Sequence, residues 1–102
     1  MFIAMNRFRV VKGHEEDFEE VWRSRETHLD QVDGFQSFKL LRGPGSDDHT
    51  LYASHTIWAD RAAFEAWTRS EHFRAAHRDA GKNKPLYLGH PEFEGFETVL
   101  SE

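Results

Sequence analysis

The sequence predicts one α+β domain over residues 1–102, a ferredoxin-like split β-α-β sandwich with helices on one face of an antiparallel sheet. Three observations lead to this fold class. The length of 102 residues suits a single domain. Strand-like alternation and helix-like periodicity follow one another in the order β-α-β-β-α-β. The three prolines all lie in segments that other signals mark as loops.

The first part of the chain predicts three strands and one helix. Alternating side chains indicate strands at Phe2–Val11, Phe35–Arg42 and His49–Trp58. The helix is expected at Glu15–Leu29, because its first turn is acidic and its apolar residues recur at spacings of three and four. Glycine, proline and aspartate mark Gly43–Asp48 as a hairpin loop.

The remaining chain predicts two further helices and a last strand. Asp60 has the position of an N-cap for a helix over Arg61–Arg69. A short helix is expected at Glu71–Ala80, where Gly81 would end it. Lys82–Pro91 is expected to be a loop, and Glu92–Leu100 alternates as a strand. Apolar side chains occur on both faces of the strands, although the helices can cover only one face. We therefore expect a homodimer packed sheet against sheet, a dimeric α+β barrel.

Charge and composition exclude several classes of function. Thirteen basic and eighteen acidic residues give a net charge of −5, which argues against nucleic-acid binding and against a polybasic membrane surface. The absence of cysteine excludes disulfides, thiolate metal sites and a cysteine nucleophile. The N-terminal residues lack the pattern of a signal peptide, and a soluble cytoplasmic protein is expected.

Common catalytic and metal-binding motifs are absent. The chain contains no nucleotide-binding glycine motif, no metalloprotease helix and no serine nucleophile elbow. His72 and His77 are five residues apart and would diverge on a helix. His49 and His55 would share a strand face but lie far apart along it. A local zinc site is therefore not expected.

Three residues stand in unusual places. Asn6 lies in the middle of a predicted strand, where asparagine is disfavoured, and a bulge or a cross-sheet hydrogen bond would also explain it. Trp67 follows Phe64 on a predicted helix and would be an ordinary core residue if taken alone. His77 follows two alanines, which leave room for a flat group, but it also fits a semi-buried structural histidine.

Together with their surroundings these residues carry a resemblance over nearly the whole chain. The segments are Phe2–Phe8, Ile57–Trp67 and Ser70–His77, and the last is the most specific, with Phe followed by Ala-Ala-His. They resemble the antibiotic biosynthesis monooxygenase superfamily and, more closely, its haem-degrading IsdG-type members.

The resemblance implies a haem-degrading monooxygenase in which haem b is both cofactor and substrate. By similarity, Asn6, Trp67 and His77 are the catalytic residues, and His77 is the ligand of the haem iron. O2 and an external electron donor, supplied by a reductase, are also implied. Because the chain has no cysteine, histidine is the natural iron ligand.

Four further side chains are expected to bind the cofactor. They are Trp22, Arg25, Phe64 and Phe73. A guanidinium binds carboxylate well, so Arg25 is expected to meet a haem propionate, although it would also suit the solvent edge of an apolar stripe.

The identity of the product and two alternative functions stay open at this stage. The segment Lys84–Glu97 departs from the tail of the staphylococcal members, so the ring-opened product is undetermined. A cofactor-independent monooxygenase of quinols or polyketides would use the same pocket without iron. A haem-binding protein without turnover would have the same ligand.

Overall fold

The structure is a computed structural model of the whole chain, and it describes residues 1–25, 29–71, 73–74 and 86–102. Four strands form one sheet in the order β2-β3-β1-β4, and every neighbouring pair is antiparallel. The chain order of the main elements is β1 (Phe2–Val11), α1 (Glu15–Ser24), β2 (Phe35–Gly45), β3 (His49–Trp58), α2 (Arg61–Thr68) and β4 (Tyr87–Glu97). The predicted ferredoxin-like α+β fold is therefore confirmed.

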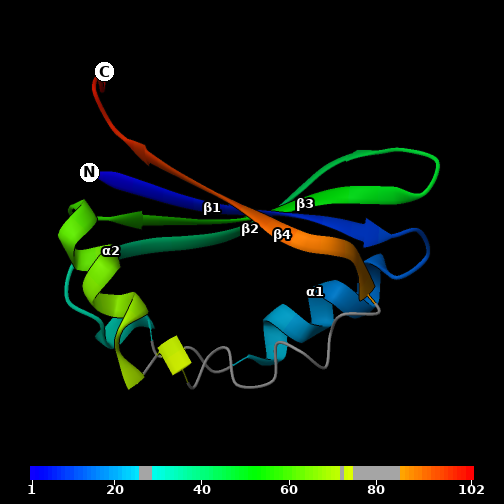
Figure 1. Cartoon of the computed structure of the whole chain (residues 1–102), viewed down its shortest axis with the longest axis horizontal. Coiled ribbons are helices and arrows are strands. Elements are labelled where there is room, and N and C mark those ends of the chain that lie inside the picture. The colour runs from blue at the N-terminus through cyan, green and yellow to red at the C-terminus, as the bar shows by residue number, and fades with distance from the viewer. Residues whose placement is uncertain (26–28, 72, 75–85) are drawn as a thin grey trace.

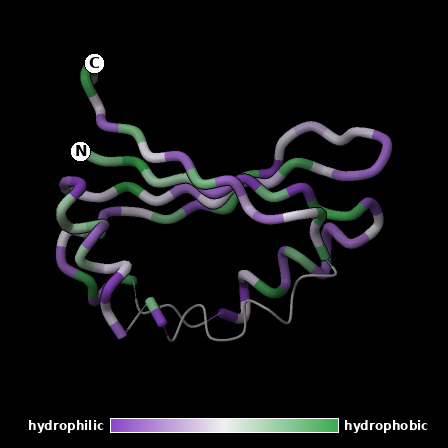
Figure 2. The backbone as a smooth tube through the Cα atoms, viewed as in Figure 1, coloured by the Kyte–Doolittle hydropathy of each residue, from purple (hydrophilic) through white to green (hydrophobic). Residues whose placement is uncertain are grey.

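Both helices lie on the same side of the sheet, α2 beneath one end and α1 beneath the other (Figure 1). Hydrophobic and hydrophilic residues alternate along the strands (Figure 2). Even-numbered residues of β1 face the helices, and odd-numbered residues face the opposite side. None of the helices in the described part of the chain has the length and apolar character needed to cross a membrane.

The core is divided into two clusters, one under each helix. Phe2, Ala4, Leu29, Trp58 and Trp67 form the cluster at the α2 end. The cluster at the α1 end consists of Phe8, Val10, Phe18 and Tyr52. β1 and β3 supply residues to both clusters, because they are the two central strands and run the full length of the sheet.

The first helix is shorter than predicted. α1 ends at Ser24, and Arg25 already has extended backbone, with φ −76° and ψ 127°. The Ser24 hydroxyl donates to the carbonyl of Glu20 at 2.9 Å, a local bond that competes with continuation of the helix. Leu29 still reaches the core, but it does so from a short 3-10 helix over Leu29–Gln31.

Strands β2 and β4 extend into segments that were predicted to be loops. β2 continues to Gly45 through an irregularity between Arg42 and Gly45. β4 begins at Tyr87, five residues earlier than predicted, and ends at Glu97. Its pairing with β1 shifts between Arg7 and Arg9, where Gly89 has φ +65°. A bulge thus accommodates the glycine and proline that suggested a loop.

The second helical region agrees with the prediction where it is described. Asp60 is the N-cap of α2, and its carboxylate accepts from the backbone N–H of Ala63 at 2.8 Å. α2 ends at Thr68, one residue before the predicted end. Most of the predicted helix Glu71–Ala80 lies outside the described residues.

Gly34 positions α2 against the start of β2. Its φ is +83°, and a Cβ atom there would lie 2.5 Å from the Cβ of Ala63. Any larger residue would have to push α2 away from the sheet. The turn at Gly34 therefore helps set the distance between α2 and β2.

Candidate active site

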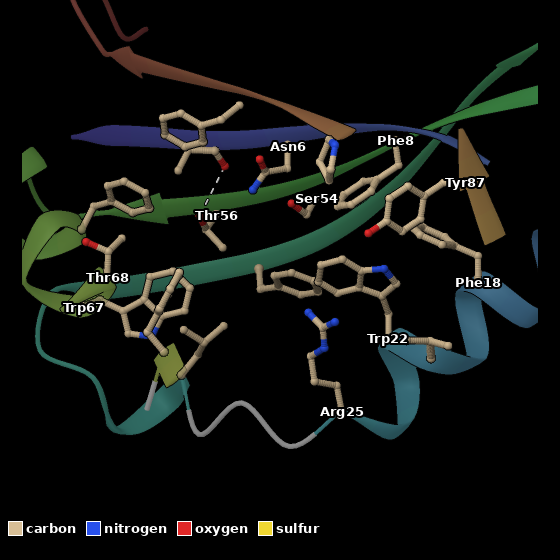
Figure 3. Close-up of a pocket in the computed structure, with 18 residues that line it drawn as sticks. Asn6, Phe8, Phe18, Trp22, Arg25, Ser54, Thr56, Trp67, Thr68 and Tyr87 are labelled. Carbon is tan, nitrogen blue, oxygen red and sulfur yellow. Dashed lines mark hydrogen bonds between the residues drawn. The ribbon is translucent and has the colours of Figure 1, made fainter. Parts of the chain in front are cut away.

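A cavity of about 510 Å³ lies between the helix-facing side of the sheet and the two helices (Figure 3). This volume is in the range of small-molecule and cofactor sites. Most of its surface is aromatic or aliphatic. The described lining residues are Ala4, Asn6, Phe8, Phe18, Val21, Trp22, Arg25, Leu29, Phe38, Ser54, Thr56, Phe64, Trp67, Thr68, Phe73, Tyr87, Pro91 and Phe93.

The cavity exists because small and polar residues interrupt the aromatic rows of the two central strands. Along β1, Ala4 and Asn6 stand between Phe2 and Phe8. Along β3, the residues that face them are Thr56 and Ser54, respectively. These short side chains line the cavity at the middle of the sheet, between the two ends beneath which α1 and α2 lie (Figure 1).

Rings from α2 and from the turn that follows it form one wall of the cavity. Trp67 meets Phe73 edge to face, with ring centroids 4.8 Å apart. Phe64 stacks on Phe93 at 5.6 Å with an interplanar angle of 6°. Behind them Trp58 is fully buried and contacts both Phe64 and Trp67. This packing holds Trp67 in place, with only 9% of its surface exposed.

The opposite wall combines two rings with a cation. Trp22 stacks on Phe38 with centroids 5.6 Å apart. The guanidinium carbon of Arg25 lies 4.3 Å from the Trp22 ring centroid, in cation–π contact. Burial lowers the pKa of Arg25. Among the described residues, no carboxylate lies within ion-pair distance of Arg25, which lines the cavity.

Asn6 lies on the floor of the cavity. It pairs in regular register with Ser54 of β3 and Phe93 of β4, so no bulge accounts for its place in the strand. Its side chain and that of Ser54 point toward the same space in Figure 3. The amide group offers two donors and one acceptor to a bound molecule.

The profile of one protein family matches most of this chain. That family is described as "Antibiotic biosynthesis monooxygenase", and the match covers residues 1–79. The chain belongs to the antibiotic biosynthesis monooxygenase family.

Relatives within and around this family differ in chemistry. A "Heme oxygenase (staphylobilin-producing)" of Staphylococcus haemolyticus is 33% identical over 88 residues, covering 80% of this chain and 78% of the relative. The heme degrader MhuD of Mycobacterium tuberculosis, solved with two hemes in its active site, is 26% identical with a TM-score of 0.74, covering 100% and 99%. SnoaB of Streptomyces nogalater, a cofactor-independent oxygenase, has the same fold at 23% identity and a TM-score of 0.68, covering 98% and 94%.

The structure brings together all but one of the site residues predicted for this family member. Six of them line the single cavity described above. They are Asn6, Trp22, Arg25, Phe64, Trp67 and Phe73. His77, the predicted iron ligand, lies outside the described residues. The described lining contains no histidine, and no group of three or more potential metal ligands occurs in the described part of the chain.

Several lining residues were missed by the sequence analysis. Phe38, Ser54 and Phe93 lie on predicted strands, but alternation alone does not tell which face of a sheet meets the helices. Tyr87 was placed in a loop. One of these residues could have been found from the sequence. Ser54 is a small polar residue in a strand otherwise rich in β-branched and aromatic residues.

Proposed function

We propose that this protein is a haem-degrading monooxygenase that binds haem b as both cofactor and substrate and opens the porphyrin ring with O2. The observation that carries the proposal is Arg25, a guanidinium at the edge of a large aromatic cavity that forms no ion pair with any carboxylate in the described part of the chain. Such a site suits a flat, largely apolar molecule that bears a carboxylate. Haem has both properties, and the relatives named for haem degradation agree with this choice.

The described residues divide the proposed work between the two sides of the cavity. Trp22 and Phe38 offer a stacked surface, and Arg25 beside them would pair with a propionate. Trp67 would press on the face of the ring, since Trp58 and Phe73 hold it from behind and from the side. A rigid ring that pushes on a flat ligand is a means of distorting it.

The remaining roles belong to Asn6 and His77. His77 is the predicted iron ligand, through a neutral ring nitrogen. Asn6 would donate hydrogen bonds from the sheet floor, where they stabilise negative charge that develops during reaction. Bound haem would supply the redox-active iron and the carbon skeleton that is oxidised. Electrons would come from an external reductase, and a cytoplasmic location is proposed with it.

A haemin titration followed by reduction in air tests the proposal. We expect haemin to develop a new Soret band, ascorbate to cause its decay, and iron to be released. If no new Soret band forms, haem chemistry is excluded and the cofactor-independent monooxygenase of quinols becomes the better reading. A stable band that survives ascorbate would instead indicate a haem-binding protein without turnover. His77→Ala should remove axial ligation, and Asn6→Ala should bind haem without degrading it.

The role of Arg25 has its own matched control. Arg25→Leu should weaken the binding of haemin about tenfold, since a buried charge-assisted pair is lost. Haemin dimethyl ester lacks the carboxylates, so its affinity should be the same for the wild type and for Arg25→Leu. An equal loss for both ligands would show that Arg25 shapes the cavity and does not recognise a carboxylate.

We also propose that the protein is a homodimer that pairs through the uncovered sheet face. That face carries apolar side chains, including Leu41 and Phe96, which are 38% and 45% exposed. It also carries two buried polar atoms that have no partner among the described residues, the Ser37 hydroxyl and His55 Nδ1. A second copy would cover the apolar residues and supply partners for these atoms. Sedimentation analysis should give twice the mass of the chain, and Leu41→Lys should favour the monomer.

A further inference from the structure

The helix-facing row of β3 contains a hydroxyl group that the fold does not use. Four hydroxyl side chains lie on this row. They are Thr50, Tyr52, Ser54 and Thr56. Thr50 donates to Glu15 at 2.7 Å, Tyr52 donates to Glu19 at 2.5 Å, and Thr56 donates to the carbonyl of Ala4 at 3.3 Å. Thr56 also accepts from the indole of Trp58 at 3.0 Å. Ser54 is the exception among these four, since no hydrogen bond links it to any described residue.

Ser54 places its hydroxyl where the cavity is the open side. It lies in a central strand and is only 7% exposed, and the surface it retains opens on the cavity. Its oxygen is not among the fully buried unpartnered atoms of the described residues, so a molecule in the cavity can reach it. Serine is also a poor strand former, and alanine would fit the same space. The hydroxyl is therefore explained more simply by a ligand than by the fold.

Ser54 faces Asn6 directly across the two central strands. The two residues are register partners of β1 and β3, so their Cβ atoms lie about 5 Å apart. The side chain of Asn6 also has no hydrogen bond to any described residue, and both side chains point into the cavity (Figure 3). The other described lining residues are aromatic or aliphatic, except for Arg25, Thr56 and Thr68.

We propose that Ser54 is a specificity-determining residue that, together with Asn6, forms a two-point hydrogen-bonding site for a small polar ligand at the centre of the cavity. The hydroxyl adds one donor to the two donors of the amide. Two donors that converge on one atom from neighbouring strands hold it more firmly than either does alone. This inference rests on the proposed haem function, because it assumes that a small oxygen-like ligand binds beside the haem iron.

Azide binding to the haemin-loaded ferric protein tests the inference without reference to turnover. Azide is a small anion that accepts hydrogen bonds, and its binding is read from the Soret band. Ser54→Ala should bind haemin with unchanged affinity but azide about fivefold more weakly, the usual effect of one lost hydrogen bond. Ser54→Thr keeps the hydroxyl and should retain the wild-type azide affinity. Ser101→Ala removes an exposed hydroxyl outside the cavity and is the matched control.

A second readout is the stretching frequency of carbon monoxide on the ferrous haem protein. A donor near the oxygen end of the ligand lowers this frequency, so Ser54→Ala should raise it and Ser101→Ala should leave it unchanged. Equal azide affinity and equal frequency in Ser54→Ala and wild type would overturn the inference while leaving the proposed function intact. An equal loss of haemin and azide affinity would make Ser54 a packing residue and would also overturn it. Failure of the wild type to bind haemin would overturn both proposals.

Discussion

The two ends of the cavity are built from different interactions. At the α2 end, Trp58, Phe64 and Trp67 pack ring against ring, and the helix meets the sheet through apolar surface. At the α1 end, Phe18 also packs on rings, but two carboxylates of the helix accept hydrogen bonds from Thr50 and Tyr52 of β3. The packing described for the first wall is mainly ring against ring, whereas the second wall also uses hydrogen bonds to carboxylates, and the one from Thr50 lowers the pKa of Glu15. The stability of the two walls should therefore respond differently to mutation and to pH.

Truncation of Trp58 is expected to have the largest effect on stability. The side chain is fully buried and contacts Phe35, Phe64 and Trp67. Trp58→Ala should lower the free energy of unfolding by about 3–5 kcal/mol, measured by urea denaturation at fixed protein concentration. Because no ionisable group is among the described contacts of Trp58, the loss should be the same at neutral and at mildly acidic pH. A loss that changes with pH would mean that the α2 wall also depends on charge.

Tyr52→Phe should weaken the α1 end by a smaller amount. The phenol donates to Glu19, which keeps ion pairs with Arg23 and Arg42 after the substitution. The free energy of unfolding should fall by about 1.5 kcal/mol in urea denaturation, the lower range for a hydrogen bond to a charged group. Phe18→Leu, which alters packing but no hydrogen bond, is the control for a purely apolar change at this end.

The raised pKa of Tyr52 should be visible in an alkaline titration. Burial, followed by the bond to Glu19, raises the pKa of Tyr52 to about 12. A raised pKa contributes stability that is complete below the ordinary value of about 10 and is lost as the pH rises through the folded value. Ultraviolet titration of the folded protein should therefore show a late ionisation that belongs to Tyr52. Tyr52→Phe should lack this late step, and its persistence there would contradict the assignment.

The sequence predicted the architecture well because alternation and periodicity report directly on burial. It predicted six of the eighteen described cavity residues, and only through a family resemblance, since Asn6 and Arg25 each had an ordinary structural explanation. The predicted ends of helices and strands were wrong where a bulge or a local hydrogen bond overrides the hydrophobic pattern. Gly89 and Pro91 read as a loop, yet a bulge keeps them in β4. Ser54 was overlooked because the importance of its hydroxyl depends on which neighbouring hydroxyls already have partners, and only three-dimensional contacts supply that information.

The cap of α2 offers a smaller test of the α2 end. Asp60 accepts a hydrogen bond from the backbone of Ala63 at 2.8 Å. Asp60→Ala should reduce the free energy of unfolding by about 1 kcal/mol, as is usual for the loss of an N-cap. Asp60→Asn keeps the accepting oxygen and should remain close to wild type. If the two variants lose the same stability in urea denaturation, the charge of Asp60 matters and its capping bond does not.

The smallest expected effect concerns Glu15 at the start of α1. The hydrogen bond from Thr50 is the main cause that lowers the pKa of Glu15 below its model-compound value of 4.5. A lowered pKa contributes stability that is present above the ordinary value and is lost as the pH falls through the folded value. In Thr50→Val, carbon-detected NMR titration should show the pKa of the Glu15 carboxyl moving up toward 4.5. An unchanged pKa would mean that the backbone N–H of Gly13, which also bonds to Glu15, is sufficient by itself. Because Glu15 lies on the helix that carries Trp22, the upward shift would show that the hydrogen bond from β3 couples this helix to the protonation of Glu15.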